Sequence, residues 1–147
     1  MLKKLGILLG ALIISSSLMQ AGMLDVFKDY NYITAEETAA LIKDKPESIV
    51  IVDIQEKSGF AKEHLKGAIS TYAYPVKKQS ELDRLAKLLP NIKADQKVIV
   101  ICPRGAGGAE RASDFLRENG IKKENLFTLK DGQEGWPRDE ISDVLEK

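Results

Sequence analysis

The stretch that decides the fold runs from Val98 to Gly120 and reads VIVICPRGAGGAERASDFLRENG. It opens on an apolar run rich in β-branched residues, which is typical of a strand buried on both faces of a sheet. A helical pattern follows the glycines and ends at Asn119-Gly120, a pair favoured at helix C-termini. The inner face of that expected helix carries the apolar residues Ala109, Ala112, Phe115 and Leu116.

Similar apolar runs on both sides of this stretch predict the other strands. Residues 47–54 (ESIVIVDI) form a second buried run, residues 125–129 (NLFTL) a third, and residues 68–69 a short one. Helical patterns separate these runs. The sequence therefore predicts an α/β domain of three layers, with a mainly parallel central sheet flanked by helices.

The expected helices are marked by their caps. Thr34, followed by Glu37, forms a capping box at the start of residues 34–43. We expect Ser80 to cap a helix that ends before Pro90, and residues 138–147 to form a short terminal helix.

Composition places the chain among globular proteins and excludes a nucleic-acid footprint. The 147 residues are 44% hydrophobic and 30% charged, and 22 basic residues balance 22 acidic ones. This length suits one domain with one core. A net charge of zero provides no basic surface for nucleic acid.

The first 21 residues have the pattern of a secretory signal. Lys3 and Lys4 precede a ten-residue apolar run at 5–14, which is short for a membrane span. We therefore expect a signal peptide at 1–21, a leading segment at 22–33 and the folded domain at 34–147. The predicted location is the periplasm or another exported compartment, and an uncleaved membrane anchor is the alternative.

Cys102 is the only cysteine of the chain and cannot form an internal disulfide. It is therefore a structural thiol, an intermolecular partner or a reactive thiol. We favour the reactive thiol, because ligands of parallel sheets bind at the carboxyl ends of strands, where Cys102 stands. Three glycines follow in the loop, at 105, 107 and 108. We expect their backbones to adopt positive φ and to turn amides inward, so that they favour a thiolate beside the helix N-terminus.

Three pieces of the chain, taken in order, resemble a known family. They are residues 52–69 (VDIQEKSGFAKEHLKGAI), 98–120 and 129–137 (LKDGQEGWP). Rhodanese-family sulfurtransferases with a single domain show similar pieces. These are a strand with Asp-x-Arg before a Gly-His-Ile-x-Gly-Ala turn, a cysteine loop with its helix, and a Gly-Gly-x-x-x-Trp turn.

The resemblance implies an activity. Cys102 would be the catalytic residue, accepting sulfur from thiosulfate or polysulfide as a persulfide and passing it to an acceptor thiol or cyanide. No metal and no organic cofactor is implied. Asp53 would support the site, whereas His64 and Trp136 would serve packing. The residues expected to bind the small sulfur-containing anion are Arg104, Gly105, Ala106, Gly107, Gly108 and Arg111.

Two departures from the family pattern stand out. Gln55 replaces the arginine of Asp-x-Arg, which removes an ion pair. We expect the helix to start near residue 109 or 110. Compared with the usual loop, Cys-x-x-Gly-x-Arg-Ser, the arginine then comes late, at Arg111, and AGGAE is an insertion that lengthens the loop. Structural interpretations also exist for the arginines. Arg104 can be a solvated loop residue, and Arg111 can pair with acidic neighbours at 110 and 114.

Two rival functions stay open. Cysteine phosphatases and arsenate reductases need an arginine six residues after the cysteine, and Gly108 occupies that position here. This makes them the weaker rival. A sulfur carrier or binding module without turnover, serving a membrane enzyme, would need the same thiolate at Cys102, and the sequence does not separate it from an enzyme.

Overall fold

The computed structural model describes residues 29–147. The predicted signal at 1–21 and most of the leading segment lie outside the described residues. Five parallel strands form the central sheet, in the order β1-β6-β5-β2-β4. Their bounds are Tyr32–Ile33 (β1), Ile49–Asp53 (β2), Ile69–Ser70 (β4), Lys97–Ile101 (β5) and Leu126–Leu129 (β6). The predicted α/β fold with a mainly parallel sheet is confirmed.

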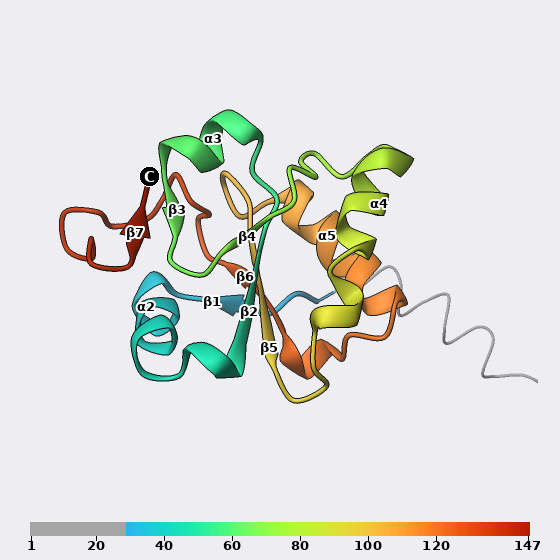
Figure 1. Cartoon of the computed structure of the whole chain (residues 1–147), viewed down its shortest axis with the longest axis horizontal. Coiled ribbons are helices and arrows are strands. Elements are labelled where there is room, and N and C mark those ends of the chain that lie inside the picture. The colour runs from blue at the N-terminus through green and yellow to red at the C-terminus, as the bar shows by residue number, and fades with distance from the viewer. Residues whose placement is uncertain (1–28) are drawn as a thin grey trace, which may run out of the picture.

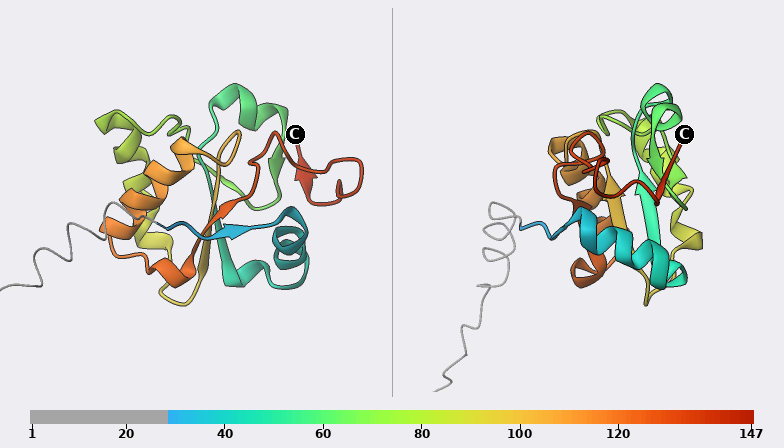
Figure 2. Two further views of the ribbon diagram at one scale, coloured as in Figure 1. Left: turned by 180° about the vertical axis from the view of Figure 1, so that it is seen from behind. Right: turned by 90° about the vertical axis from the view of Figure 1, so that its left-hand side faces the viewer.

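Helices cover both faces of the sheet, which gives the three layers seen in Figures 1 and 2. Their bounds are Ala35–Asp44 (α2), Lys57–Lys62 (α3), Gln79–Ala86 (α4) and Gly107–Glu118 (α5). Short 3₁₀ turns precede β2, follow α4 and precede β6, at Pro46–Ser48, Leu89–Asn91 and Lys123–Asn125. In the part of the chain that the structure describes, no helix is both long enough and apolar enough to cross a membrane.

The two central strands sort their side chains by type between the two layers. Val50 and Val52 of β2 share one buried cluster with the valines of β5 and with apolar residues of α4 and α5. Ile49 and Ile51 point to the other face, where they join the isoleucines of β5 and side chains of α2. This follows from the two-residue period of a strand, because both faces of the sheet are buried here.

The helix ends agree with the sequence in two places and differ in one. Thr34 and Glu37 form the predicted capping box, in which each side chain accepts a hydrogen bond from the other's backbone N–H, at 3.1 and 3.0 Å. Gly120 follows α5 with a φ of +100°, as expected for a C-terminal cap. Ser80 is not a cap. Helix α4 starts at Gln79. The carboxylate of Glu81 accepts hydrogen bonds from the backbone N–H groups of Lys77 and Lys78, just before the helix.

The predicted terminal helix at 138–147 is wrong. This segment forms turns and ends in a short strand, β7 (Leu145–Glu146), which pairs antiparallel with β3 (His64–Leu65). The indole N–H of Trp136 donates to the Ile141 carbonyl at 2.7 Å and holds the turn. Pairing with β3 and the burial of Val144 outweigh the local helical preference.

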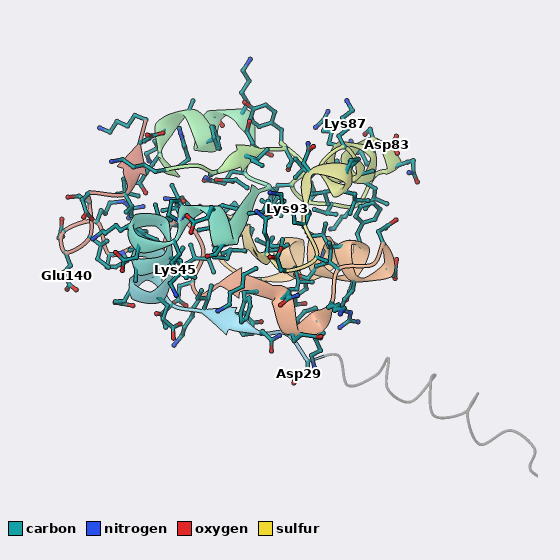
Figure 3. The ribbon with its side chains drawn as sticks, turned by 60° about the horizontal axis from the view of Figure 1, so that its bottom comes forward. Asp29, Lys45, Asp83, Lys87, Lys93 and Glu140 are labelled. Carbon is teal, nitrogen blue, oxygen red and sulfur yellow. The ribbon has the colours of Figure 1, made fainter. Side chains whose placement is uncertain are left out.

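Packing roles for the single histidine and the single tryptophan agree with the structure. The His64 ring stacks on Phe60 with centroids 3.8 Å apart, and its Nδ1 lies 2.8 Å from the Phe60 carbonyl oxygen. Trp136 is only 2% exposed. Exposed charges of both signs lie around the periphery of the domain, as the labelled Lys45, Asp83 and Glu140 illustrate in Figure 3.

Candidate active site

Cys102 lies immediately beyond the carboxyl end of β5, at the edge of the sheet where parallel strands commonly carry ligands. Its thiol is free, and the residue is 2% exposed. The backbone N–H of Gly105 donates a hydrogen bond to the Cys102 sulfur at 2.9 Å. The sulfur therefore lies within its own loop, and the Gly105 amide points at it.

The loop after Cys102 is shorter than the sequence suggested. Helix α5 begins at Gly107 rather than near residue 109 or 110, so only residues 103–106 separate the cysteine from the helix. The interpretation of AGGAE as an insertion is therefore wrong. The family pattern Cys-x-x-Gly-x-Arg-Ser runs onto residues 102–108 without a gap. Gly107 then stands where the pattern has arginine, and Gly108 where it has serine.

The three loop glycines have different surroundings. Gly105 alone adopts a positive φ, +69°, and a Cβ there would lie 2.8 Å from the Leu129 carbonyl oxygen. Gly107 and Gly108 are helical, so the expectation of positive φ is wrong for both. A Cβ at Gly107 would meet the guanidinium of Arg111 at 3.0 Å, and one at Gly108 would meet the Tyr74 ring at 2.9 Å.

The N-terminus of α5 faces the site without a side-chain cap. Ala106 is the N-cap residue, and its methyl group offers no acceptor to the amides of the first turn. The partial positive charge of those amides is thus available to an anion held beside Cys102.

Both predicted arginines contact one segment, Tyr74-Pro75. Nη2 of Arg104 donates to the Tyr74 hydroxyl at 3.4 Å, and Nε of Arg111 donates to the Pro75 carbonyl at 3.0 Å. Arg104 is exposed and Arg111 half-buried. The two guanidinium groups therefore contact neighbouring residues of one segment, and their binding to an anion stays a prediction.

Tyr74 is a site residue that the sequence analysis missed. It follows β4, whose carboxyl end lies at the same edge of the sheet as that of its neighbour β2. The signal available in the sequence was an aromatic pair, TYAYP, directly after that short strand. Its contact with Gly108 joins segments more than thirty residues apart and has no local pattern.

The turn at 129–137 packs against the loop at 102–106 and is hydrogen-bonded to it. The backbone N–H groups of Gln133 and Glu134 donate to the carbonyls of Cys102 and Pro103, both at 2.9 Å. Gly132 has a φ of +65°, and a Cβ there would lie 2.5 Å from the Cys102 carbonyl oxygen. This close packing explains the glycine of the turn, and its anchoring residues were also missed.

Asp53 ends β2 and is fully buried, beside the strand that carries Cys102. Its carboxylate accepts from the backbone N–H of Gln55 at 2.9 Å and from the Gln55 amide at 3.1 Å. The same amide reaches the Glu63 carbonyl at 3.2 Å. Burial raises the pKa of Asp53 to about 6, although both Gln55 hydrogen bonds lower it. A neutral amide thus stands where the family pattern has an arginine.

The described part of the chain was also searched for groups of side chains that could bind a metal ion. Within residues 29–147, no three histidine, cysteine, aspartate or glutamate side chains gather into a group that could hold a metal ion.

Comparisons with known proteins agree with this geometry. The sequence profile of the Rhodanese-like domain family matches residues 34–139. The rhodanese-like domain of an Anabaena protein has a similar structure, with a TM-score of 0.60 and 16% identity, covering 80% of each chain. A rhodanese-related protein of Thermoplasma volcanium gives a TM-score of 0.54 at 20% identity, covering 75% of this chain and 93% of its own.

A larger protein contains the same fold as one part. The reduced Bacillus anthracis CoADR-RHD gives a TM-score of 0.58 at 17% identity, covering 88% of this chain but 20% of its own. No curated protein sequence matches this chain. The parallel sheet, with Cys102 at the carboxyl end of a central strand, is consistent with the match to the family profile. The chain belongs to the rhodanese-like domain family.

Gly105 and Gly107 offer a matched pair for testing the loop. In Gly105→Ala, the left-handed backbone and the contact with Leu129 should lower the free energy of unfolding by at least about 2 kcal/mol. In Gly107→Ala, the Arg111 guanidinium can move, so the change should stay below about 1 kcal/mol. Urea unfolding of both variants measures the difference, and equal losses would contradict this account of the loop.

Asp53 should make stability depend on pH in a defined direction. Because its folded pKa lies near 6 and its ordinary value is 3.8, the folded state binds the proton more tightly. The Asp53 contribution to stability is therefore full below about pH 4 and is lost as pH rises through 6.

The comparison is with Asp53→Asn, which cannot titrate. Between pH 4 and pH 7, the wild type should lose up to about 3 kcal/mol relative to the variant. Urea unfolding of both proteins at the two pH values measures this, and a constant difference between them would contradict the assignment.

Proposed function

We propose that this protein is a sulfurtransferase that carries sulfane sulfur as a persulfide on Cys102. Family membership supports sulfur transfer or a related activity in general. The observation that carries the specific proposal is the hydrogen bond from the Gly105 N–H to the Cys102 sulfur, beside a helix N-terminus that lacks a side-chain cap. In this proposal the Gly105 N–H stabilises the Cys102 thiolate, and the helix N-terminus stabilises the negative charge on the outer sulfur of the persulfide.

The proposed reaction has two displacements. The Cys102 thiolate attacks the outer sulfur of thiosulfate, a sulfur–sulfur bond to Cys102 forms, and the bond to the sulfite sulfur breaks. Sulfite leaves with that electron pair, and Cys102 keeps a persulfide anion. An acceptor thiolate or cyanide then attacks the outer sulfur, and the Cys102 thiolate leaves. Neither step needs an oxidant, a metal or an organic cofactor.

Each part of the site has a proposed role. The Gly105 amide steadies the sulfur anion, and the first-turn amides following Ala106 and Gly107 face the anionic end of the donor. Arg104 and Arg111 supply the two positive charges for that end. Gly108 also leaves room for the Tyr74 ring, which a Cβ at this position would meet at 2.9 Å. Since Cys102 is only 2% exposed, the site favours a small donor such as thiosulfate or a short polysulfide.

We further propose that the protein works outside the cytoplasm. The basic residues and short apolar run within residues 1–21 support export to the periplasm or a similar compartment. A membrane enzyme that receives sulfur is one candidate partner there, and a small thiol is another. A carrier without turnover would form the same persulfide but would release sulfur only to its partner.

Sulfur loading of Cys102 tests the proposal. After incubation with thiosulfate or polysulfide, intact mass spectrometry should show one or more added sulfur atoms that dithiothreitol removes. Cys102→Ser should show none, because a hydroxyl is not a nucleophile for sulfane sulfur in this setting. An unmodified wild-type mass with both donors would reject the sulfurtransferase function.

Two parallel arms separate the rivals. Turnover with thiosulfate and cyanide, followed as thiocyanate, distinguishes an enzyme from a carrier that loads once and stops. Hydrolysis of an aryl phosphate tests the phosphatase alternative. We expect no hydrolysis above the Cys102→Ser background, because Gly108 leaves the phosphatase arginine position empty.

A further inference from the structure

The two arginines beside Cys102 are long, flexible side chains, yet one short segment holds both. This segment, Tyr72–Val76, crosses from β4 towards α4. Arg104 contacts its tyrosine hydroxyl and Arg111 its proline carbonyl. An arginine side chain that is free in solution loses rotamer entropy when it is ordered around a ligand. A segment that orders both arginines beforehand reduces this loss on binding.

The segment itself is firmly placed. The backbone N–H of Tyr74 donates to the Ile54 carbonyl at 2.8 Å, and that of Val76 to the Ala73 carbonyl at 2.7 Å. Tyr72 and Val76 flank it with φ values of +54° and +60°. Positive φ is unusual for an aromatic residue and rarer still for a β-branched one, and it persists only where surrounding contacts fix the backbone.

The Tyr74 ring is also fixed from the side of the helix. A Cβ at Gly108 would lie 2.9 Å from two ring carbons, Cδ2 and Cε2, so only glycine lets the ring approach the first turn of α5 this closely. Gly107 similarly leaves room for the Arg111 guanidinium, because a Cβ there would lie 3.0 Å from Nη1 of Arg111. The two helical glycines and the Tyr72–Val76 segment thus fit together as one unit.

We propose that Tyr74 is a positioning residue, which acts by holding Arg104 through its hydroxyl and, together with the Pro75 carbonyl, aligns both guanidinium groups for the anionic end of the sulfur donor. The proposal rests on the proposed function for the identity of the donor. The arrangement of the arginines beside the thiol can be measured without sulfur transfer.

The test compares two alkylating reagents of nearly equal size on Cys102: iodoacetate, which is an anion, and iodoacetamide, which is neutral. Their rate ratio reports the positive charge aligned beside the thiol, whereas changes in thiol reactivity or access affect both reagents. In Tyr74→Phe the ring stays and the hydroxyl contact with Arg104 is lost. We expect the iodoacetate-to-iodoacetamide ratio to fall about threefold, with little change in the iodoacetamide rate.

Tyr72→Phe is the matched control. It removes the same chemical group two residues away, from a ring that packs edge-on against Phe60. Its ratio should equal that of the wild type. If Tyr74→Phe also leaves the ratio at the wild-type value, Tyr74 does not position Arg104 and the proposal is overturned.

A second pair of variants tests the fit between Tyr74 and Gly108. Gly108→Ala should displace the ring and lower the ratio, whereas the same change in a Tyr74→Ala background should have no further effect. Thermal unfolding of each variant verifies folding. Equal effects of Gly108→Ala in both backgrounds would overturn the role of the ring.

Kinetics with thiosulfate then link the arrangement to sulfur transfer. Tyr74→Phe should raise KM about threefold and leave kcat within about twofold, because binding of the anion weakens while the thiol is unchanged. If Cys102 takes no sulfur but the alkylation ratio shifts as expected, the proposed function fails and the positioning role stands. If sulfur is transferred and the ratio does not shift, the positioning role fails alone.

Discussion

The hydrogen bond from the Gly105 N–H to the Cys102 sulfur is the interaction on which the site depends. It requires the chain to turn from β5 into α5 within residues 103–106, which in turn requires a positive φ at Gly105. That turn packs so closely on Gly132 that neither glycine has room for a side chain. The conformation of Cys102 is therefore set jointly by the loop that follows β5 and the turn that follows β6.

Much of the fold follows from local pattern, and the errors have physical causes. The apolar runs placed β2, β5 and β6, because strands buried on both faces show few polar interruptions. The terminal strand β7 was predicted as a helix, because its pairing with β3 joins residues some eighty positions apart. The start of α5 was placed too late because glycine is a poor helix former. Gly107 and Gly108 nevertheless form the start of α5, where a Cβ on Gly108 would meet the Tyr74 ring.

The residues of the candidate site also fall into two groups, those that the sequence predicted and those that it did not. Cys102, Arg104, Arg111 and Asp53 could be selected from sequence, because each stands in or next to a recognisable strand or loop. Other contributions come from contacts across the sheet edge, made by Tyr74 and by the turn at 129–137. Such contacts join distant segments and cannot be predicted from spacing in the sequence. The interpretation of AGGAE as an insertion was wrong for the same reason, because it depended on where a side chain reaches in space. Without the structure, Arg111 seemed displaced along the chain, whereas its side chain in fact reaches back one helical turn to Gly107.

The separation of valines and isoleucines between the two layers has a consequence for how the sheet is aligned. Residues 49–52 of β2 and 98–101 of β5 are apolar on both faces of the sheet, so polarity does not oppose a shift within these runs. Here Val50 pairs with Val98 and Ile51 with Ile99. Moving β5 by one residue would push isoleucines against α4 and α5 and leave valines too small for the α2 side. Overpacking on one face and voids on the other would oppose the shift. The difference of a single methylene group thus encodes the alignment that delivers Cys102 to its loop.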